Sequence, residues 1–407
     1  MRRRGKLDQL APLIDEAERL DRARRDAIQR VEEQKAQRNR LSQEVGRGKK
    51  AGENTDAPQA AARALGDSIA ALELEQGAAE TRLNEILLGI PNITRADVPA
   101  GDESANVVVR SWGTPREAKG VAPHWEVAGK LGILDLARGA KVAGSGFIVH
   151  RGAGARLVRS LLNLMLDLHS TEFGYEELWV PVVVTRDAMT GTGQLPKFED
   201  DMYRLADEEL FLIPTAEVPI TNLYRDEILT ADELPRAFCA YSPCFRREAG
   251  AAGKDTRGLL RVHQFDKVEL VRYCAPEDGE AQLQLLLSHA EAVLQRLGLP
   301  YRVILLAAGD TGFASAKTYD LEVFAPGVDK WLEVSSCSLF TDFQARRANI
   351  RYRPAAAEKP RFVHTLNGSG LALPRVIAAI LEHYQQPDGS VRVPEALRGA
   401  LGADRFA

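Results

Sequence analysis

The segment FRREAGAAGKDTRGLLRVHQFDKVE, residues 245–269, predicts a strand, a long loop and a second strand. It begins with an apolar residue beside an Arg-Arg-Glu cluster and ends on alternating residues up to Glu269. Between them, Gly250, Gly253 and Gly258 supply the backbone freedom that a tight loop needs.

The predicted loop is basic, with cations at Arg246, Arg247, Lys254, Arg257 and Arg261. Cations held on a glycine-containing loop suit a polyanionic ligand, and a nucleotide phosphate is the first candidate. A solvated hairpin loop that is merely basic is the alternative.

The same segment resembles motif 2 of class II aminoacyl-tRNA synthetases, in the form found in seryl-tRNA synthetases of the bacterial type. FR-x-E stands at one end and HQF-x-KVE at the other. Further matching strings, in the order of the family, are GTGQLPKF (191–198), PTAE (214–217), TYDLEV (318–323), EVSSCS (333–338), DFQARR (342–347) and TLNGSGLALPR (365–375). The resemblance runs from about residue 8 to the C-terminus. It implies an α+β fold with an antiparallel sheet flanked by helices and an N-terminal antiparallel coiled-coil arm.

Composition is that of an ordinary soluble protein of two or three domains, with 407 residues, 45% hydrophobic and 27% charged. No run approaches the roughly 20 apolar residues of a membrane helix. The start, MRRRGKLDQL, lacks the apolar stretch of a secretory signal. We therefore expect a cytoplasmic protein without a membrane partner.

The four cysteines are widely spaced, and no pair has C-x-x-C spacing: Cys239, Cys244, Cys274 and Cys337. We expect them to be reduced and buried, and we expect no zinc. A metal shared by Cys239, Cys244 and His263 is the alternative.

The N-terminal region predicts a helical hairpin. Apolar residues recur on one face between Leu7 and Val45, and the polar, glycine-rich segment 46–58 predicts a turn. A coiled-coil seam with strict four-three spacing follows at Leu65, Ile69, Leu72, Gln76, Ala79, Leu83 and Ile86. Prolines and polar residues between Ile90 and Asp102 then predict a linker, so we assign residues 1–92 to the arm and 93–407 to the catalytic domain.

Charge is unevenly divided along this hairpin. Residues 1–50 contain 15 Lys/Arg against 9 Asp/Glu, whereas residues 51–90 contain 2 against 7. A dimerisation coiled coil is one interpretation. We favour an arm for an elongated partner, which the resemblance identifies as tRNA(Ser), with tRNA(Sec) as a second candidate and DNA excluded. The expected tRNA-binding residues are Arg22, Arg25, Arg30, Lys35 and Arg38.

The remaining chain predicts an antiparallel sheet, because short strands dominate after Tyr203 and no P-loop or Rossmann fingerprint occurs. An amphipathic helix at Ala155–Phe173 precedes a strand at Glu177–Thr185 that contains Pro181. The resemblance makes this pair motif 1 and implies a homodimer. A buried edge strand is the alternative.

Activation of an amino acid is an in-line displacement at the α-phosphorus of ATP, which requires positioning and charge neutralisation. The resemblance places Arg246 between the α-phosphate and the substrate carboxylate. It places Glu248 at the adenine amino group, Phe265 on the base and Arg375 at the γ-phosphate. Glu333 and Ser336 would hold Mg²⁺, while Val334, Ser335 and the additional cation Arg247 would line the ATP site. Arg246, Glu333 and Arg375 are the expected catalytic residues.

Serine would be recognised by a separate set. We expect Glu269, assisted by Ser369, to bind the side-chain hydroxyl, because a buried group left unpaired rejects a substrate that lacks the hydroxyl. Thr215, Ala216 and Glu217 are assigned to serine, with Thr215 and Glu217 at its ammonium group. An ion pair with Lys267 is the alternative role for Glu269, and we expect it to be weak because Lys267 can also reach solvent.

Two rival functions remain at this stage. A synthetase paralogue would form seryl-adenylate but transfer serine to a carrier protein or metabolite. A coiled-coil binding protein with a decayed catalytic body would lack the intact arginines and carboxylates of the four motifs.

Overall fold

The computed structural model describes residues 1–249 and 257–407, in two compact units, Met1–Pro91 and Asn92–Ala407. Gly250, Gly253 and Lys254 of the predicted loop lie outside the described residues.

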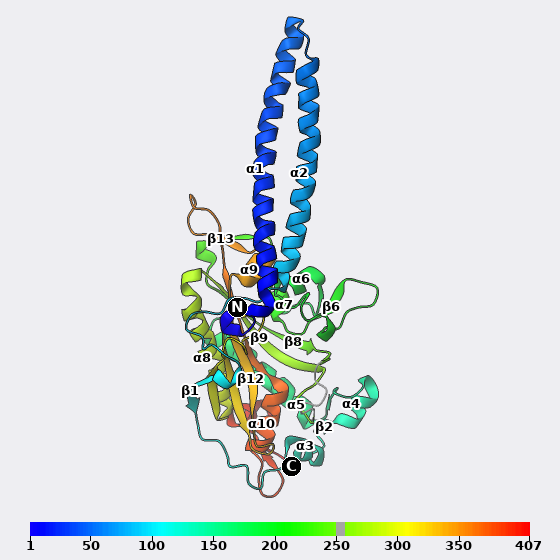
Figure 1. Cartoon of the computed structure of the whole chain (residues 1–407). Helices are drawn as coiled ribbons and strands as arrows, with labels where there is room; N and C mark the ends of the chain where they lie inside the picture. Colours follow the sequence, from blue (N-terminus) through cyan, green and yellow to red (C-terminus); the bar gives the residue numbers. More distant parts are fainter. Residues whose placement is uncertain (250–256) are drawn as a thin grey trace. The chain divides into compact units, whose positions relative to one another are not determined.

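The first unit is a hairpin of two long helices, α1 (Leu7–Ala51) and α2 (Asp56–Gly89), after a short 3₁₀ turn, η1 (Arg2–Arg4) (Figure 1). The predicted turn at 46–58 was wrong for most of its length, because α1 continues to Ala51. Gly48 leaves room for Thr55 at the end of the turn, since a Cβ at position 48 would lie 2.7 Å from Thr55 Cγ2. The turn itself begins at Gly52, whose φ of 72° suits glycine.

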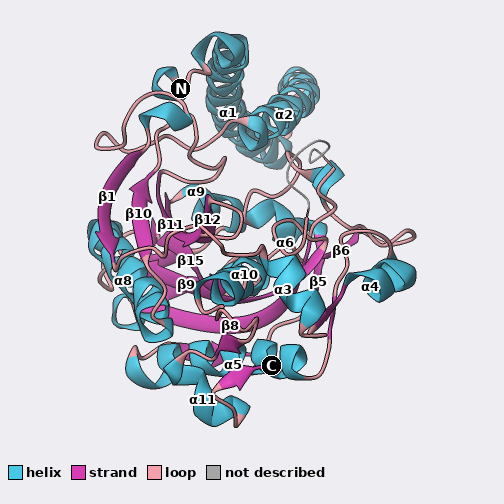
Figure 2. Ribbon diagram, turned by 90° about the horizontal axis from the view of Figure 1, so that it is seen from below, coloured by secondary structure: helices cyan, strands magenta, loops and turns pink. Residues whose placement is uncertain are grey.

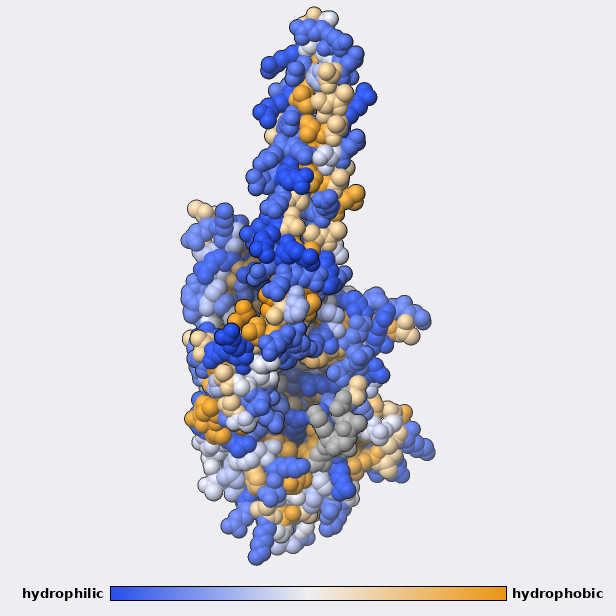
Figure 3. All heavy atoms as spheres, viewed as in Figure 1, coloured by the Kyte–Doolittle hydropathy of each residue, from blue (hydrophilic) through white to orange (hydrophobic). Residues whose placement is uncertain are grey.

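The predicted seam is buried inside the hairpin. Ile86 and Leu83 pack with Ala17, and Ile69 and Leu72 pack with Val31. Figure 3 shows a mostly hydrophilic surface along the two helices with a narrow apolar stripe. The antiparallel coiled-coil arm is therefore confirmed, and burial of the seam stabilises it.

The second unit is built on an eight-stranded sheet with the order β1-β10-β11-β12-β15-β9-β8-β4. Neighbouring strands are antiparallel except for the parallel pair β4 and β8. The strands are β1 (Val107–Trp112), β4 (Glu176–Leu178), β8 (Arg236–Phe245), β9 (Gln264–Cys274), β10 (Tyr301–Leu305), β11 (Lys317–Ala325), β12 (Lys330–Thr341) and β15 (His364–Ala372). The predicted antiparallel sheet is confirmed.

Helices and short strands surround this sheet. The helices are α3 (His124–Lys130), α4 (Leu136–Ala143), α5 (Ala153–Asp167), α6 (Arg186–Gly191), α7 (Glu217–Thr221), α8 (Gly279–Leu297), α9 (Phe343–Ala348), α10 (Leu373–His383) and α11 (Glu395–Leu401). The short strands are β2 (Leu134–Asp135), β3 (Val149–His150), β5 (Val183–Thr185), β6 (Leu210–Leu212), β7 (Ile228–Thr230), β13 (Arg351–Arg353), β14 (Arg361–Phe362), β16 (Val391–Arg392) and β17 (Arg405–Phe406).

One face of the sheet is covered by α8, and the other is covered in part, where Val271 and Tyr273 of β9 pack against residues of α7 and α9. A Cβ on Gly368 of β15 would lie 2.3 Å from Leu286 Cδ2, so α8 packs directly on the first face. Side chains alternate along a strand, and Asn367 and Ser369 therefore project from the opposite face. Figure 2 shows the strands as one curved sheet with α5 and α8 against it.

One strand prediction was wrong, and one strand was missed. The segment Glu177–Thr185 divides around Pro181 into β4 and β5, which belong to different sheets. Strand β15 was not predicted, because its glycines weaken the apolar alternation. These glycines are required by close packing: a Cβ on Gly370 would lie 2.8 Å from His169 Nε2.

All four cysteines are buried and unpaired. Burial raises the pKa of the Cys239, Cys274 and Cys337 thiols to about 12. Within the described ranges, no group of three or more His, Cys, Asp or Glu side chains is arranged to hold a metal ion, and no helix is long and apolar enough to cross a membrane.

Candidate active site

Two adjoining cavities open on the face of the sheet opposite α8. The larger, about 600 Å³, contains Thr215, Glu217, Ser336 and Asn367 among its lining residues. The smaller, about 110 Å³, contains Phe265, Val334, Pro374 and Arg375. Residues that line both are Arg246, Glu248, Arg261, Lys267, Glu333 and Ser369. Most of the residues predicted for serine and for ATP thus line one or both of these cavities, and Arg246, Glu248, Glu333 and Ser369 lie at their shared boundary.

Strand pairing accounts for this convergence. In β9 and β15, Glu269 lies opposite Ser369 and Lys267 lies opposite Ala372. On the other side of β9, Ser242 of β8 lies opposite Lys267. Alternation then places Lys267, Glu269 and Ser369 on one face, although they come from segments 100 residues apart.

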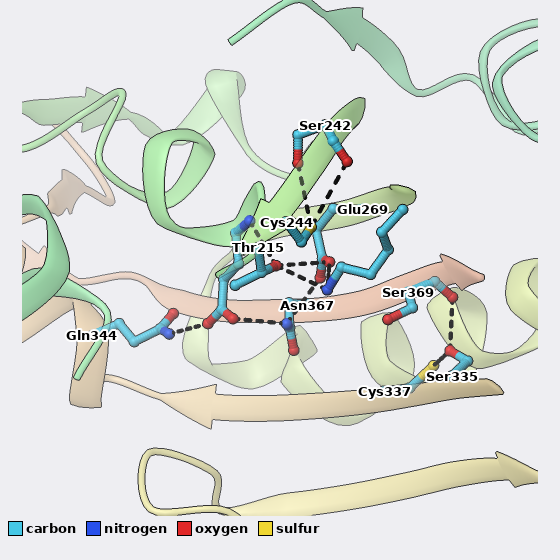
Figure 4. Close-up of polar contacts among 11 residues, drawn as sticks. Thr215, Ser242, Cys244, Glu269, Ser335, Cys337, Gln344, Asn367 and Ser369 are labelled. Atoms are coloured by element: carbon cyan, nitrogen blue, oxygen red, sulfur yellow. Dashed lines mark hydrogen bonds and ion pairs between the residues drawn. The ribbon is translucent and has the colours of Figure 1, made fainter. Parts of the chain in front are cut away.

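A buried polar network forms the floor of the larger cavity (Figure 4). Thr215 donates to Glu269 Oε2 at 2.9 Å and accepts from Lys267 Nζ at 2.9 Å. Lys267 also forms an ion pair with Glu269, and the two residues are 5% and 0% exposed. The expectation that Lys267 would reach solvent was wrong, since the ion pair is formed inside the protein. Glu269 lies behind Thr215 and lines neither cavity.

Among the residues that the structure describes, Glu217 has no cation as a hydrogen-bond partner. Its carboxylate accepts from Gln344 Nε2 at 2.6 Å and from Asn367 Nδ2 at 3.0 Å. Asn367 also donates to Glu269 at 2.9 Å, so one amide joins the two carboxylates. Burial, followed by the charge of Glu269, raises the pKa of Glu217 to about 7. A cationic ligand at this point would supply the missing counter-charge.

At the nucleotide end, two contacts of Arg246 and Glu248 shape the smaller cavity. The guanidinium carbon of Arg246 lies 5.2 Å from the centre of the Phe265 ring. Glu248 has a φ of 50° and accepts from Arg261 at 2.5 Å. Because a positive φ costs a non-glycine residue free energy, the Arg261 contact helps to hold the Glu248 carboxylate at the cavity.

Arg375 stands near the start of α10, where its guanidinium crosses to β12. It donates to the Glu333 backbone oxygen at 2.7 Å and to the Leu260 oxygen at 3.4 Å. A carboxylate oxygen of Glu333 lies 3.5 Å from the same guanidinium. Two of the three predicted catalytic residues, Glu333 and Arg375, are therefore adjacent.

A set of hard oxygen atoms lies beside Glu333. Ser336 is opposite Asp320 in the register of β11 and β12, and both residues line a cavity with Glu333. The Asp320 Oδ1 atom is buried without a hydrogen-bond partner, and burial, followed by the charge of Glu333, raises the pKa of Asp320 well above its usual value. Carboxylate and hydroxyl oxygens beside an unsatisfied acidic atom fit Mg²⁺ by their chemistry.

Four predicted site residues do not line these cavities: Glu269, described above, and three others. Ala216 is fully buried in an apolar cluster before α7. Arg247 is exposed and donates to the Asp200 backbone oxygen at 3.1 Å. Ser335 is buried and donates to the Ser369 backbone oxygen at 2.7 Å, so it supports β15 from the next strand.

Sequence reasoning assigned no site role to Val262, Asn367 and Gln344, and it considered Lys267 only as a weak partner of Glu269. Lys267, Asn367 and Gln344 lie within the quoted motif strings, but nothing local distinguishes a buried polar contact from an exposed one. Their roles emerge only when β9, β15 and α9 come together.

Comparison with known protein families supports this geometry. Residues 1–94 match the seryl-tRNA synthetase N-terminal domain, and residues 197–384 match the class II tRNA synthetase core domain of the G, H, P, S and T enzymes. A serine–tRNA ligase of Gemmatimonas aurantiaca is 67% identical over 99% of this chain and 95% of its own length. The chain belongs to the seryl-tRNA synthetase family.

Solved members of the seryl-tRNA synthetase family have the same fold. The Pyrococcus horikoshii seryl-tRNA synthetase complexed with ATP superposes with a TM-score of 0.94 and 38% identity, covering 100% of this chain and 95% of that one. The Naegleria fowleri cytoplasmic enzyme in complex with AMP gives 0.88 and 30%, covering 99% and 95%. Both of these relatives were solved with an adenine nucleotide, ATP in the first and AMP in the second.

The basic residues predicted on the arm of this seryl-tRNA synthetase differ in their surroundings. Arg22 and Arg30 are exposed and form no ion pair with the described residues. Arg25 pairs with Asp21 and Lys35 pairs with Glu73 across the hairpin, each at 2.7 Å. Arg38 is partly buried, two helical turns after Val31 and in line with the seam. The expected tRNA-binding residues therefore differ in how accessible their charges are.

Proposed function

We propose that this seryl-tRNA synthetase converts serine and ATP to seryl-adenylate and then aminoacylates tRNA(Ser). In the first step, a serine carboxylate oxygen bonds to the α-phosphorus and pyrophosphate leaves. In the second, a hydroxyl of the terminal ribose attacks the acyl carbon and AMP leaves. The observation that carries the proposal is the position of Arg246 on the boundary shared by the two cavities.

In the proposed ATP complex, adenine occupies the smaller cavity. Phe265 provides a flat apolar surface for the base, Glu248 accepts from its exocyclic amino group and Val262 and Val334 complete the walls. Arg246 neutralises charge at the α-phosphate, and Arg375 does so at the γ-phosphate. Bidentate guanidinium contacts suit both tasks, because charge spreads over the phosphoryl oxygens in the transition state.

Glu333 and Ser336 are the proposed ligands of Mg²⁺, with Asp320 beside them. When bound, the ion would neutralise phosphate charge and orient the leaving pyrophosphate. Independently of the ion, the Glu333 backbone oxygen orients Arg375, which links the metal side of the site to the γ-phosphate side.

Serine is proposed to bind in the larger cavity. Its ammonium group would lie between Thr215 and Glu217, whose carboxylate accepts from two amides, those of Gln344 and Asn367. Ser369 and Glu269 are the proposed partners of the side-chain hydroxyl. Because Lys267 and Thr215 both bind the same oxygen of Glu269, one of these contacts must change for Glu269 to reach the substrate.

The helical arm is the proposed binding site for tRNA(Ser), with Arg22 and Arg30 as its free phosphate contacts.

A homodimer is proposed on the motif 1 resemblance, supported by the 82% exposure of Trp179 next to β4. The proposed compartment is the cytoplasm, where the substrates of translation occur. A paralogue that serves another acceptor is less favoured, because similarity to serine–tRNA ligases covers the arm and the core together.

Pyrophosphate exchange tests the proposal directly. The protein should exchange labelled pyrophosphate into ATP only when serine is present, and it should charge tRNA(Ser) but not a tRNA with a short variable arm. Exchange without charging would favour the paralogue. Absence of exchange by the folded protein, with alanine and threonine also tested, would overturn the synthetase assignment.

A further inference from the structure

A buried His–Glu pair lies beside the returning end of motif 2, where neither side chain lines a cavity described above. His124 begins α3, and Glu382 is the penultimate residue of α10. Both are 0% exposed. Glu382 Oε1 lies 2.8 Å from His124 Nδ1 and accepts from the His124 backbone N–H at 2.9 Å, while Oε2 accepts from Gly327 at 2.7 Å. Three donors thus hold the carboxylate in one orientation.

This carboxylate determines the tautomer of His124. Because Nδ1 faces an acceptor, it carries the proton and donates to Glu382. Nε2 then has a free lone pair, and it accepts from the Leu259 backbone N–H at 3.0 Å. The imidazole therefore connects α10 to the motif 2 backbone through one donor and one acceptor.

The imidazole fits its place with little free space. Trp125 packs edge-on against it, with ring centres 4.9 Å apart. A Cβ on Gly258 would lie 2.3 Å from His124 Nε2 and 2.9 Å from Trp125 Cε3, and Gly258 has a φ of 62°. A larger residue at position 258 would displace the backbone from His124.

The backbone that His124 holds leads directly to the nucleotide cavity. Leu259 and Leu260 line that cavity, and the Leu260 oxygen accepts from Arg375. The next residue, Arg261, donates to Glu248. Arg375 and Glu248 are thus both in contact with a three-residue segment whose first N–H is bound by His124.

We propose that His124, oriented by Glu382, is a positioning residue for ATP. It touches no substrate. By fixing the backbone at Leu259, it holds the Leu260 oxygen where it accepts from Arg375. It likewise holds Arg261 where it donates to Glu248. The serine floor is anchored separately, by Thr215, Lys267 and Asn367. This inference rests on the proposed function, and it predicts that loss of the Leu259 contact impairs ATP binding selectively.

Two substitutions at position 124 separate the contacts. In His124→Asn, the shorter amide can replace Nδ1 toward Glu382 but cannot reach Leu259. In His124→Gln, the longer amide can replace Nε2 and accept from Leu259. Loss of one buried hydrogen bond should raise the KM for ATP about tenfold in His124→Asn, with the KM for serine changed less than about twofold. His124→Gln should restore most of the ATP affinity.

His289→Asn is the matched control, because His289 is a buried histidine bonded to Tyr175 at 3.1 Å and forms no hydrogen bond with the described residues of motif 2. It should lower stability without changing the ratio of the two KM values. Gly258→Ala tests the same contact from the loop and should reproduce the selective ATP defect.

Serine-dependent exchange by the unsubstituted protein is measured first, so failure of the proposed function is recognised separately. If that activity is present, equal changes in both KM values in folded His124→Asn and Gly258→Ala would overturn the positioning role. Unchanged KM values would overturn it too. If neither variant folds, His124 is a structural residue and the proposal fails.

Discussion

Protonation of Glu217 should make serine binding depend on pH near neutrality. Burial and the neighbouring Glu269 raise the pKa of Glu217 to about 7, so the free protein takes up a proton there as the pH falls. An ammonium group beside Glu217 stabilises the carboxylate, and serine binding must therefore release that proton. The apparent Kd for serine therefore rises as the pH decreases, in inverse proportion to the fraction of Glu217 that is ionised.

The size of this effect follows from the pKa. With a free-state pKa of about 7, the apparent Kd for serine rises by a factor of about 1.1 at pH 8, about 2 at pH 7 and about 11 at pH 6. Serine affinity should thus fall about tenfold between pH 8 and pH 6. Calorimetry at pH 7, in buffers with different ionisation enthalpies, should detect release of about half a proton per serine bound.

Glu217→Gln provides the control, because an amide binds serine weakly but does not titrate. Its serine affinity should be lower and nearly constant across the same range, and the KM for ATP of the unsubstituted protein should change little.

The variant also has a stability signature. A carboxyl with a raised pKa binds more protons when folded, so its stability falls as the pH rises from about 4.5 to about 7, by about 3 kcal/mol in total. Glu217→Gln should lack that decline in urea unfolding. A flat serine affinity between pH 6 and pH 8, or an unaltered slope in Glu217→Gln, would refute the ammonium assignment.

Three further predictions concern the other parts of the molecule. Arg246→Ala should abolish serine-dependent pyrophosphate exchange. Arg247→Ala should change the exchange rate less than about threefold, because Arg247 binds the Asp200 backbone oxygen. Equal losses of exchange in the two variants would contradict the role proposed for Arg246. Glu269→Ala should lower the unfolding free energy, measured by urea titration, by about 3–5 kcal/mol, because it leaves Lys267 buried without a counter-ion. In exchange kinetics, it should raise the KM for serine more than the KM for ATP. Reversal of Arg22 and Arg30 to Glu should weaken charging of tRNA(Ser), most strongly at low salt, and leave exchange intact. Arg38→Glu is expected to destabilise the hairpin instead, which circular dichroism would reveal. Normal charging by the Arg22 and Arg30 variant would mean that the tRNA binds elsewhere.

The sequence alone determined the elements whose signals are local. The four-three seam from Leu65 to Ile86 specified a coiled coil, because buried residues must recur on one helical face. The ordered motifs specified the family and most of the site, including Arg246, Glu333 and Arg375. Short strands without a phosphate-binding loop were sufficient to predict an antiparallel sheet.

Tertiary structure decided what depends on burial by distant segments. Strand β15 exists because Leu286 and His169 pack where its glycines leave space, a requirement that the local pattern does not contain. Lys267 pairs with Glu269 because β8, β15 and Thr215 close over it; on an isolated strand, the same lysine would be hydrated. Glu217 has its high pKa for the same reason, since water is replaced by Gln344, Asn367 and a second carboxylate. A local pattern specifies which face of an element is apolar, but the free energy of a polar group is set by whatever the completed fold places around it.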